Sequence, residues 1–487
     1  MLLSQISFLR MSGSLKNKTV KGVVWSTLER FSVAGVNFVF GLILARLLMP
    51  SDYGAIAMLA IFMAIAQTFI DSGFSNALIR KQNRTETDNA TAFYFNIGVG
   101  LVAYFLLYLV APYIAQFYNA SILTSLTRIM GLNLLFNSLC VVQQALLTAC
   151  IDFKTQAKIS LSAAIVSGLV GIGFAYAGYG VWALAIQSVL ASIIRTILLW
   201  ILAKWRPKAR FSKQSFHSLF GYGSKLLASG LLDTIYNNLY TIVIGKRFSA
   251  ATLGVYSRSD QWANFLAVNI TGILQRVTFP VLSTIQSEDE RLRTNYRKFL
   301  RISGFVVFPL MIGLAAVASP LTRFILTDKW VDSIPLIRIL CFALMLYPIH
   351  AINLNLLQVK GRSDLFLRLE IYKKILGVAT LCVTIPMGIT AMCAGRVFTS
   401  WVALVMNTYY TGKLIHLGFF QQLKDYMPTL LNSFVMGTIV YVVTLVVPGS
   451  GMQLLTGIVV GATYYIVSNS LFKTMEWKEI KLIIKRK

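Results

Sequence analysis

No charged side chain occurs in the stretch Thr91-Ala-Phe-Tyr-Phe-Asn-Ile-Gly-Val-Gly-Leu-Val-Ala-Tyr-Phe-Leu-Leu-Tyr-Leu-Val-Ala-Pro-Tyr-Ile-Ala-Gln116. A helix of about 20 apolar residues crosses the roughly 30 Å hydrocarbon core of a bilayer, so this run predicts a transmembrane helix. Similar runs recur along the chain and predict about fourteen spans. They lie near 20–46, 54–79, 91–116, 121–150, 159–177, 179–203, 217–245, 252–284, 300–321, 335–358, 366–387, 390–412, 427–447 and 452–472. The sequence therefore predicts an all-α integral membrane protein.

The charge balance distinguishes a basic membrane protein from a basic nucleic-acid-binding protein. Lys and Arg number 45 against 18 Asp and Glu, a net charge of +27, yet only 13% of the 487 residues are charged. In soluble domains, roughly 25% of the residues are charged. A nucleic-acid-binding protein needs a hydrophilic surface rich in Lys and Arg, and a chain that is 56% hydrophobic does not provide one. The composition thus excludes a nucleic-acid partner.

Most basic residues mark one side of the membrane. They gather in alternate connections, where they outnumber those on the opposite side by about six to one, so the positive-inside rule predicts that these connections and both termini are cytoplasmic. The most basic connection is Lys204–Lys213, KWRPKARFSK. For each such loop, contact with anionic lipid headgroups is the simplest role. No cleavable signal peptide is expected, because the first apolar run continues into a full span.

These assignments divide the chain into seven segments. They are a basic cytoplasmic leader (1–19), an N-terminal lobe of six spans (20–203), a cytoplasmic linker (204–216), a C-terminal lobe of six spans (217–412), a cytoplasmic loop (413–426), two further spans (427–472) and a cytoplasmic tail (473–487).

An internal repeat relates the two lobes at an offset of 200 residues. Gly41-Leu-Ile-Leu-Ala-Arg46 lies over Thr241-Ile-Val-Ile-Gly-Lys246, and Gly54 lies over Gly254. Because each half has an even number of spans, the repeats are parallel, related by an axis along the membrane normal. This predicts two lobes around a central cavity, hinged through the linker, as in an alternating-access carrier. The alternative is that two spans resemble each other only because both are spans.

Ionisable side chains within the spans are the candidates for a substrate site. A charge at bilayer depth costs at least about 2.5–3.5 kcal/mol, so it usually faces protein or water. Across the following ionisable positions, bases outnumber acids by about nine to five, which predicts a cationic cavity that attracts anions. These positions are Glu29, Arg30, Asp71, Arg128, Arg195, Lys225, Asp233, Arg258, Asp260, Arg276, Glu370, Lys373, Lys374 and Arg396. The anion-binding candidates are Arg30, Arg128, Arg195, Lys225, Arg258 and Arg276, and the candidates for a coupling-ion site or a structural acid are Glu29, Asp71 and Asp233. Near the inner interface, Arg30 and Asp71 could instead snorkel or pair structurally.

Neither a metal site nor an enzyme is indicated. The five cysteines fall in or beside spans without the spacing of metal ligands, which favours buried thiols. His217, His350 and His416 are isolated from one another, and the sequence has no nucleophile elbow or phosphate-binding loop. We expect no catalytic residue, no metal and no cofactor.

Four ordered runs resemble a known family. They are Leu44-Ala-Arg-Leu-Leu-Met-Pro-Ser-Asp-Tyr-Gly54, Ala66-Gln-Thr-Phe-Ile-Asp-Ser-Gly-Phe-Ser-Asn-Ala-Leu-Ile79, Gly178-Tyr-Gly-Val-Trp-Ala-Leu184 and Leu253-Gly-Val-Tyr-Ser-Arg258. The chain is similar to the polysaccharide flippases of the Wzx type, in the subgroup that exports colanic-acid and teichuronic-acid units. These belong to the MOP superfamily, with the MATE drug exporters and the lipid II flippase. The family motifs coincide with Arg46, Asp71 and Arg258.

The resemblance implies a MATE-like fold of two six-helix lobes with two extra C-terminal helices. It also implies a flippase that moves undecaprenyl-pyrophosphate-linked oligosaccharide units across the bacterial inner membrane, for exopolysaccharide, capsule or lipopolysaccharide O-antigen synthesis, through a cationic lumen. The implied partners are this lipid-linked substrate and membrane lipids, with the polysaccharide polymerase and chain-length machinery as further candidates. The alternatives are a MATE-like exporter of small molecules or drugs, which needs acidic lumen residues, and a non-transporting scaffold.

Overall fold

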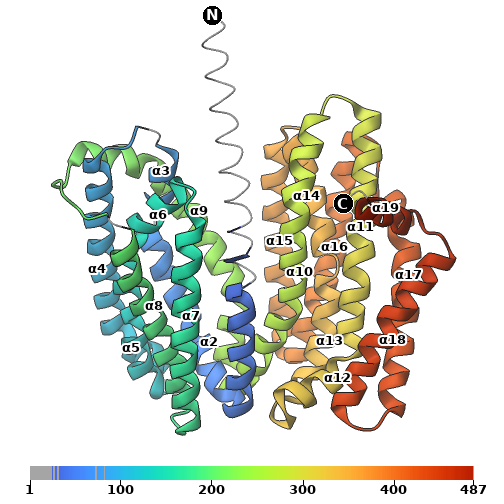
Figure 1. The fold of residues 1–487 in the computed structure, drawn as a ribbon, viewed down its shortest axis with the longest axis horizontal. Helices are drawn as coiled ribbons and strands as arrows, with labels where there is room; N and C mark the ends of the chain where they lie inside the picture. Colours follow the sequence, from blue (N-terminus) through green and yellow to red (C-terminus); the bar gives the residue numbers. More distant parts are fainter. Residues whose placement is uncertain are drawn as a thin grey trace, which may run out of the picture. The chain divides into compact units, whose positions relative to one another are not determined.

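A computed structural model gives the fold of the chain (Figure 1). It describes residue 25 and residues 28–29, 32–71, 74–81, 83–203 and 205–485, with side chains for all of these except Arg80, Tyr222, Lys225, Arg276, Ile480 and 482–485. Every regular element in these ranges is a helix, which confirms the predicted all-α class. The chain forms two compact units, residues 1–254 (unit 1) and 255–487 (unit 2).

In the part of unit 1 that the structure describes, an apolar helix covers Ser32–Leu47. The unit continues with α2 (Pro50–Asp71), α3 (Phe74–Arg80), α4 (Glu86–Tyr118), α5 (Ile122–Ser138), α6 (Val141–Ala149), α7 (Phe153–Tyr176), α8 (Val181–Leu202) and α9 (Lys213–Arg247), and α10 (Ala250–Thr284) leads into unit 2. Within unit 1, α4 packs along α5, α7 along α8 and α2 along α9. Helix α9 therefore lies in the same compact unit as the first spans.

Unit 2 contains longer helices joined by short ones. They are α11 (Asp289–Ala316), α12 (Ala318–Leu321), η1 (Thr322–Leu326), η2 (Asp328–Trp330), α13 (Ser333–Leu344), α14 (Tyr347–Val359), α15 (Ser363–Thr384), η3 (Ile385–Met387), α16 (Ile389–Ile415), α17 (Phe419–Val446), α18 (Ser450–Leu471) and α19 (Met475–Lys485). The main packing partners are α11 with α17, α17 with α18, and α13 with α16. The boundary of the two predicted lobes at 204–216 stays a prediction.

The described residues contain ten helices long and apolar enough to cross a membrane. Helices α5 and α6 meet at a bend of 43° and together make an eleventh, so the chain is a multi-pass membrane protein. The predicted spans 217–245 and 366–387 form α9 and α15, but these helices carry several charges. The predicted first span, 20–46, lies partly outside the described residues. The total of fourteen therefore stays a prediction.

Local sequence determines where the helices begin and end. At the start of α4, the Thr85 hydroxyl accepts a hydrogen bond from the Asp88 amide, and the Asp88 carboxylate accepts one from the Thr85 amide. Such reciprocal bonds satisfy two of the amide groups that a helix start leaves unpaired. The same helix ends at Asn119, which adopts the left-handed conformation with φ of 53°, a conformation that asparagine tolerates better than most residues.

The start of α2 crosses the start of α10 within unit 1, through the glycines of the predicted repeat. A Cβ atom added to Gly54 would lie 1.7 Å from the carbonyl oxygen of Ala250, and one added to Gly254 would lie 1.8 Å from that of Pro50. Residue 54 contacts residue 250, and residue 254 contacts residue 50. The contact is therefore reciprocal between positions that the 200-residue offset makes equivalent. Small residues of this kind allow helix backbones to approach closely in membranes.

Replacing Gly54 by Ala is expected to destabilise the protein by about 1–3 kcal/mol, because the added methyl group meets backbone atoms that cannot rotate away. Thermal unfolding in detergent, followed by tryptophan fluorescence, measures the effect. The control is Gly98→Ala in α4, where an added Cβ meets nothing within 4 Å. Equal melting temperatures for the two variants would contradict the close crossing.

Buried polar contacts join the helices of unit 2. The side-chain amides of Asn353 in α14 and Gln422 in α17 exchange hydrogen bonds of 3.2 and 3.3 Å, and the Thr411 hydroxyl in α16 donates to Asn353 at 2.7 Å. All three residues are at most 1% exposed. Interhelical hydrogen bonds contribute about 0.6 kcal/mol each in membrane proteins, so this cluster holds three helices in register.

Candidate functional site

A polar cavity of about 690 Å³ lies among six helices of unit 1. Its lining residues come from α2, α3, α5, α6, α8 and α9 and from the connection between α5 and α6. They are Gln67, Thr68, Asp71, Ser75, Asn76, Asn137, Cys140, Val141, Gln144, Thr148, Arg195, Leu226, Leu227 and Gly230. Most of them carry an amide, hydroxyl or charged group, which is unusual inside a membrane-spanning bundle, where polar side chains are costly. We call this cavity the polar pocket.

A chain of hydrogen bonds organises one wall of the polar pocket. The Asn137 side chain donates to the Gln67 side-chain oxygen at 3.0 Å, and the Gln67 amide donates to the Asp71 carboxylate at 3.1 Å. Thr68 contacts Thr234 of α9 through their hydroxyl oxygens, which lie 3.1 Å apart. These contacts fix amide and carboxylate groups toward the cavity and join α2 to α5 and α9.

Arg195 supplies the positive charge of the polar pocket. Its side chain is exposed on α8, and no hydrogen bond or ion pair to it is found among the described residues, so its five N–H donors are available to a ligand. The adjacent residue, Thr196, is buried and donates to the carbonyl oxygens of Phe136 and Ser192, and it accepts a hydrogen bond from the Cys140 thiol. These bonds hold the backbone of α8 against α5 next to Arg195.

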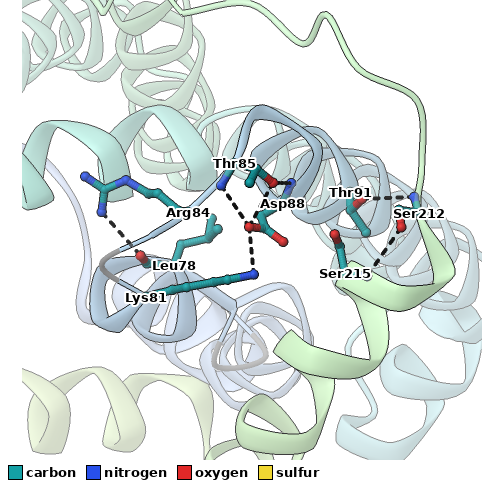
Figure 2. A network of polar contacts seen from close by, with 8 residues as sticks. All are labelled: Leu78, Lys81, Arg84, Thr85, Asp88, Thr91, Ser212 and Ser215. Carbon is teal, nitrogen blue, oxygen red and sulfur yellow. Dashed lines mark hydrogen bonds and ion pairs between the residues drawn. The ribbon is translucent and has the colours of Figure 1, made fainter.

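Figure 2 shows a polar network at the start of α4 that positions helix α3. Helix α3 contributes Ser75 and Asn76 to the pocket. The Lys81 ammonium lies 2.7 Å from the Asp88 carboxylate, which is almost fully buried. The Arg84 guanidinium donates to the Leu78 carbonyl at 3.4 Å. The loop between α3 and α4 is therefore held at both ends.

The structure places two of the predicted site residues, Asp71 and Arg195, in the polar pocket. Arg128 lies outside the lining set, with its guanidinium 4.3 Å from the centre of the Tyr108 ring. Glu29 accepts a hydrogen bond of 2.9 Å from Ser160 of α7. Asp233 is an exposed residue of α9.

The remaining predicted residues are placed less completely. Arg258 belongs to unit 2, is 9% exposed and donates to the Gln261 side chain at 2.6 Å. Arg30 lies outside the described residues. Lys225 and Arg276 belong to α9 and α10, but their side chains are outside the described set. Leu226 and Leu227, which directly follow Lys225, line the polar pocket.

Reasoning from charge missed the neutral part of the pocket. Gln67, Asn76, Asn137 and Gln144 line it, and none is ionisable. The signal that could have revealed them is the presence of amides in otherwise apolar runs, since an amide in hydrocarbon also needs a partner. The charged side chains among the described lining residues are Arg195 and Asp71, and the other polar groups there are amides and hydroxyls.

Part of the predicted surplus of bases in unit 2 is neutralised by acids. The Arg396 guanidinium donates to the Asp260 carboxylate at 2.5 Å and to the Tyr256 hydroxyl at 2.9 Å. Asn264 donates to the second Asp260 oxygen at 2.7 Å. Lys373 pairs with Glu370 one turn away on α15. These bases have structural partners within their own unit.

Comparison with known proteins identifies the family of the chain. Residues 43–335 match the family described as polysaccharide biosynthesis protein. The chain belongs to this family. The lipopolysaccharide biosynthesis protein WzxC of Escherichia coli K12 is 26% identical over 76% of each chain. The teichuronic acid biosynthesis protein TuaB of Bacillus subtilis 168 is 26% identical over 72% of this chain and 73% of TuaB. The resemblance to the Wzx-type subgroup is thus confirmed.

Solved structures show the fold of this family member. The lipid II flippase MurJ, in an inward closed conformation, aligns with a TM-score of 0.71 at 14% identity, over 92% of this chain and 98% of MurJ. An inward-facing multidrug resistance MATE transporter of the MOP superfamily aligns with a TM-score of 0.60 at 14% identity, over 78% and 94%. The predicted MATE-like fold is confirmed.

Proposed function

We propose that this polysaccharide biosynthesis family member is a flippase for undecaprenyl-pyrophosphate-linked oligosaccharide units in the bacterial inner membrane. The observation that carries the proposal is the polar pocket, which lies inside a membrane-spanning unit and is lined by amides, hydroxyls and Arg195. Among the described residues, Arg195 makes no ion pair. The pocket volume of about 690 Å³ lies in the range of small-ligand sites, roughly 300–1,000 Å³, and suits one part of a lipid-linked headgroup.

The chemistry of the pocket matches a glycan and its phosphate. Sugar hydroxyls both donate and accept hydrogen bonds, as do the side-chain amides of Gln67, Asn137 and Gln144. A phosphate or an acidic sugar would pair with Arg195, whose planar guanidinium favours two parallel hydrogen bonds to oxyanions. Such pairing lowers the cost of bringing a dianion to membrane depth. Among the described lining residues, one arginine lies with Asp71 and neutral amides, which also permits release, whereas a dense cationic cluster would oppose it.

Translocation follows from alternating exposure of the headgroup to the two sides. In the proposed cycle, the pyrophosphate and glycan enter from the cytoplasmic side while the polyprenyl tail stays in lipid, and rocking of the two lobes then exposes the headgroup outside. An apolar groove of about 590 Å³ between α11, α17 and α18 of unit 2 supports a place for the hydrocarbon chain in this cycle. Both termini are proposed to be cytoplasmic, from the distribution of Lys and Arg.

Transport rather than catalysis is also supported by a relative whose name states transport. It is the succinoglycan biosynthesis transport protein ExoT of Rhizobium meliloti 1021, 23% identical over 68% of each chain. We accordingly propose no catalytic residue and no cofactor. The polysaccharide polymerase and chain-length machinery are proposed partners, as they would receive the exported unit.

A gene-replacement experiment tests the proposal in cells. A strain without its own flippase for a known repeat unit accumulates that unit on the cytoplasmic leaflet, and expression of this chain is expected to restore surface polysaccharide. Lipid-linked oligosaccharide in the membrane and polysaccharide at the surface are measured together. Continued accumulation for every repeat unit tested, with the chain present in the membrane, would contradict the proposal.

A further inference from the structure

The connection between α8 and α9 is fixed to unit 1 along its length. We call residues Trp205–Ser212 the strap. The Glu86 carboxylate accepts a hydrogen bond from the Trp205 indole at 2.8 Å and one from the Lys208 amide at 3.1 Å. The Thr91 hydroxyl accepts one from the Ser212 amide at 3.0 Å. Three bonds therefore hold the strap on the first turns of α4, although the sequence predicts a hinge here.

The strap alternates between residues that face the protein and residues that face away from it. Trp205, Pro207 and Ala209 are half-buried, whereas Arg206, Lys208 and Arg210 are exposed. Every exposed position in this alternation is a base. The strap therefore presents three exposed cations at alternate positions, with a bend at Ala209.

The surface next to the strap changes from apolar to cationic within a few residues. At the end of α8, Ile197, Ile201 and Leu202 are 52%, 62% and 43% exposed, as expected for side chains that face lipid. The Arg206 guanidinium lies 4.7 Å from the Trp200 ring centre and donates to the Trp200 carbonyl oxygen. Tryptophan and arginine at the end of an apolar helix are typical of the headgroup layer.

Phe211 adds an apolar contact to this basic row. Its side chain is 47% exposed, next to Arg210. An exposed aromatic ring beside cations is favourable where both the hydrocarbon boundary and the phosphate layer are within reach, and less so on a surface that meets only water. This combination favours a lipid surface over a soluble polyanion.

We propose that the strap is a docking surface for the phosphate groups of anionic phospholipids, contacted by Arg206, Lys208 and Arg210. The proposal uses the cytoplasmic placement of the strap in the proposed topology, and it goes beyond the flippase function because the ligand is a bulk lipid. The strap leads directly into α9, whose Leu226 and Leu227 line the polar pocket. Bound headgroups thus fix the end of a helix that forms the pocket.

Lipid titration of the purified full chain tests this docking surface. Phosphatidylglycerol or phosphatidylethanolamine is added to the protein in detergent, and bound lipid is counted by native mass spectrometry. Each base near an anionic surface strengthens binding about 5-fold, so the triple variant R206Q/K208Q/R210Q is expected to bind phosphatidylglycerol about 100-fold more weakly. The matched control is R368Q/K424Q/K473Q, which removes three exposed bases of unit 2 and is expected to leave the affinity of the strap unchanged.

A second variant separates the attachment of the strap from its charge. Glu86→Gln keeps all three exposed bases but weakens the bonds that hold the strap. It is expected to reduce the preference for phosphatidylglycerol, by a factor several-fold smaller than in the triple variant. Equal affinity of the triple variant and the wild type, or equal binding of both lipids by the wild type, would overturn the proposal. Displacement of the lipid by millimolar glycerol phosphate would also overturn it, in favour of a soluble anion site. The assay involves no transport, so its outcome is independent of the flippase test.

Discussion

Arg195→Gln is expected to lower export of the lipid-linked glycan by about 10- to 100-fold, because a hydrogen bond to a charged group contributes about 1.5–3 kcal/mol. Arg195 is the one cation among the described residues that line the pocket, and the substitution replaces it with a shorter, neutral polar side chain. Arg195 makes no ion pair within the described part of the chain, so its loss leaves no buried partner unsatisfied and stability should change little. Surface polysaccharide and the amount of protein in the membrane are measured in the same cells.

Two further variants show whether position or charge alone matters. Arg195→Lys keeps the charge but not the forked donors, and it should retain part of the activity. Arg128→Gln removes a cation that stacks on Tyr108 outside the pocket lining, and it should change export far less than Arg195→Gln does. If Arg195→Gln retains full export, the pocket role of this residue is wrong.

Asp425→Asn is expected to be among the most destabilising single substitutions in unit 2. The Asp425 carboxylate, with a side chain 2% exposed, accepts hydrogen bonds from Arg297 at 2.7 and 2.6 Å and from Arg301 at 2.5 Å. These bonds join α11 to α17. Removing one partner of a buried ion pair costs about 3–5 kcal/mol; we expect about 2–4 kcal/mol here because both arginines reach water. The loss is measured as a lower melting temperature in detergent.

The control for Asp425→Asn is a pair of the same residue types at the surface. Arg362 and Asp364 form an ion pair of 2.8 Å with side chains 46% and 51% exposed. The neighbouring guanidinium lowers the pKa of the Asp364 carboxyl to about 2, so the pair is charged at neutral pH, but exposed pairs contribute little. Asp364→Asn should leave the melting temperature unchanged. A similar decrease for both variants would contradict the structural role of Asp425.

The fold could be predicted largely from the sequence because its strongest signals are local. Long apolar runs define the spans. The 200-residue offset aligned Gly54 with Gly254 as equivalent positions of a repeat, but it did not predict that they lie together in the crossing of α2 and α10. Helices α9 and α15 are long but not apolar enough to count as membrane spans by hydropathy, because charged residues are distributed along them. Hydropathy alone treats those charges as evidence against a span, although packing can bury them.

The site could be predicted only in part, because charge is a poor guide to which side chains share a cavity. Asp71 and Arg195 both line the polar pocket although they are far apart in sequence. The amides beside them gave no signal in a search for ionisable groups. Arg396 carries a charge but pairs with Asp260, and the linker expected to be a hinge is bound to Glu86. These outcomes depend on tertiary contacts that no local pattern encodes.

The most direct test of the proposed function is translocation by the purified protein in liposomes. A fluorescent undecaprenyl-pyrophosphate oligosaccharide is placed in both leaflets, and an impermeant reagent that modifies the sugar reports the fraction exposed outside. With the wild-type chain, the labelled lipid should exchange between leaflets until nearly all is modified, and Arg195→Gln should slow this exchange about 10- to 100-fold. Modification that stops at the outer half in wild-type liposomes, as in protein-free ones, would contradict the account, and extrusion of a small organic cation by the same liposomes would favour the drug-exporter alternative.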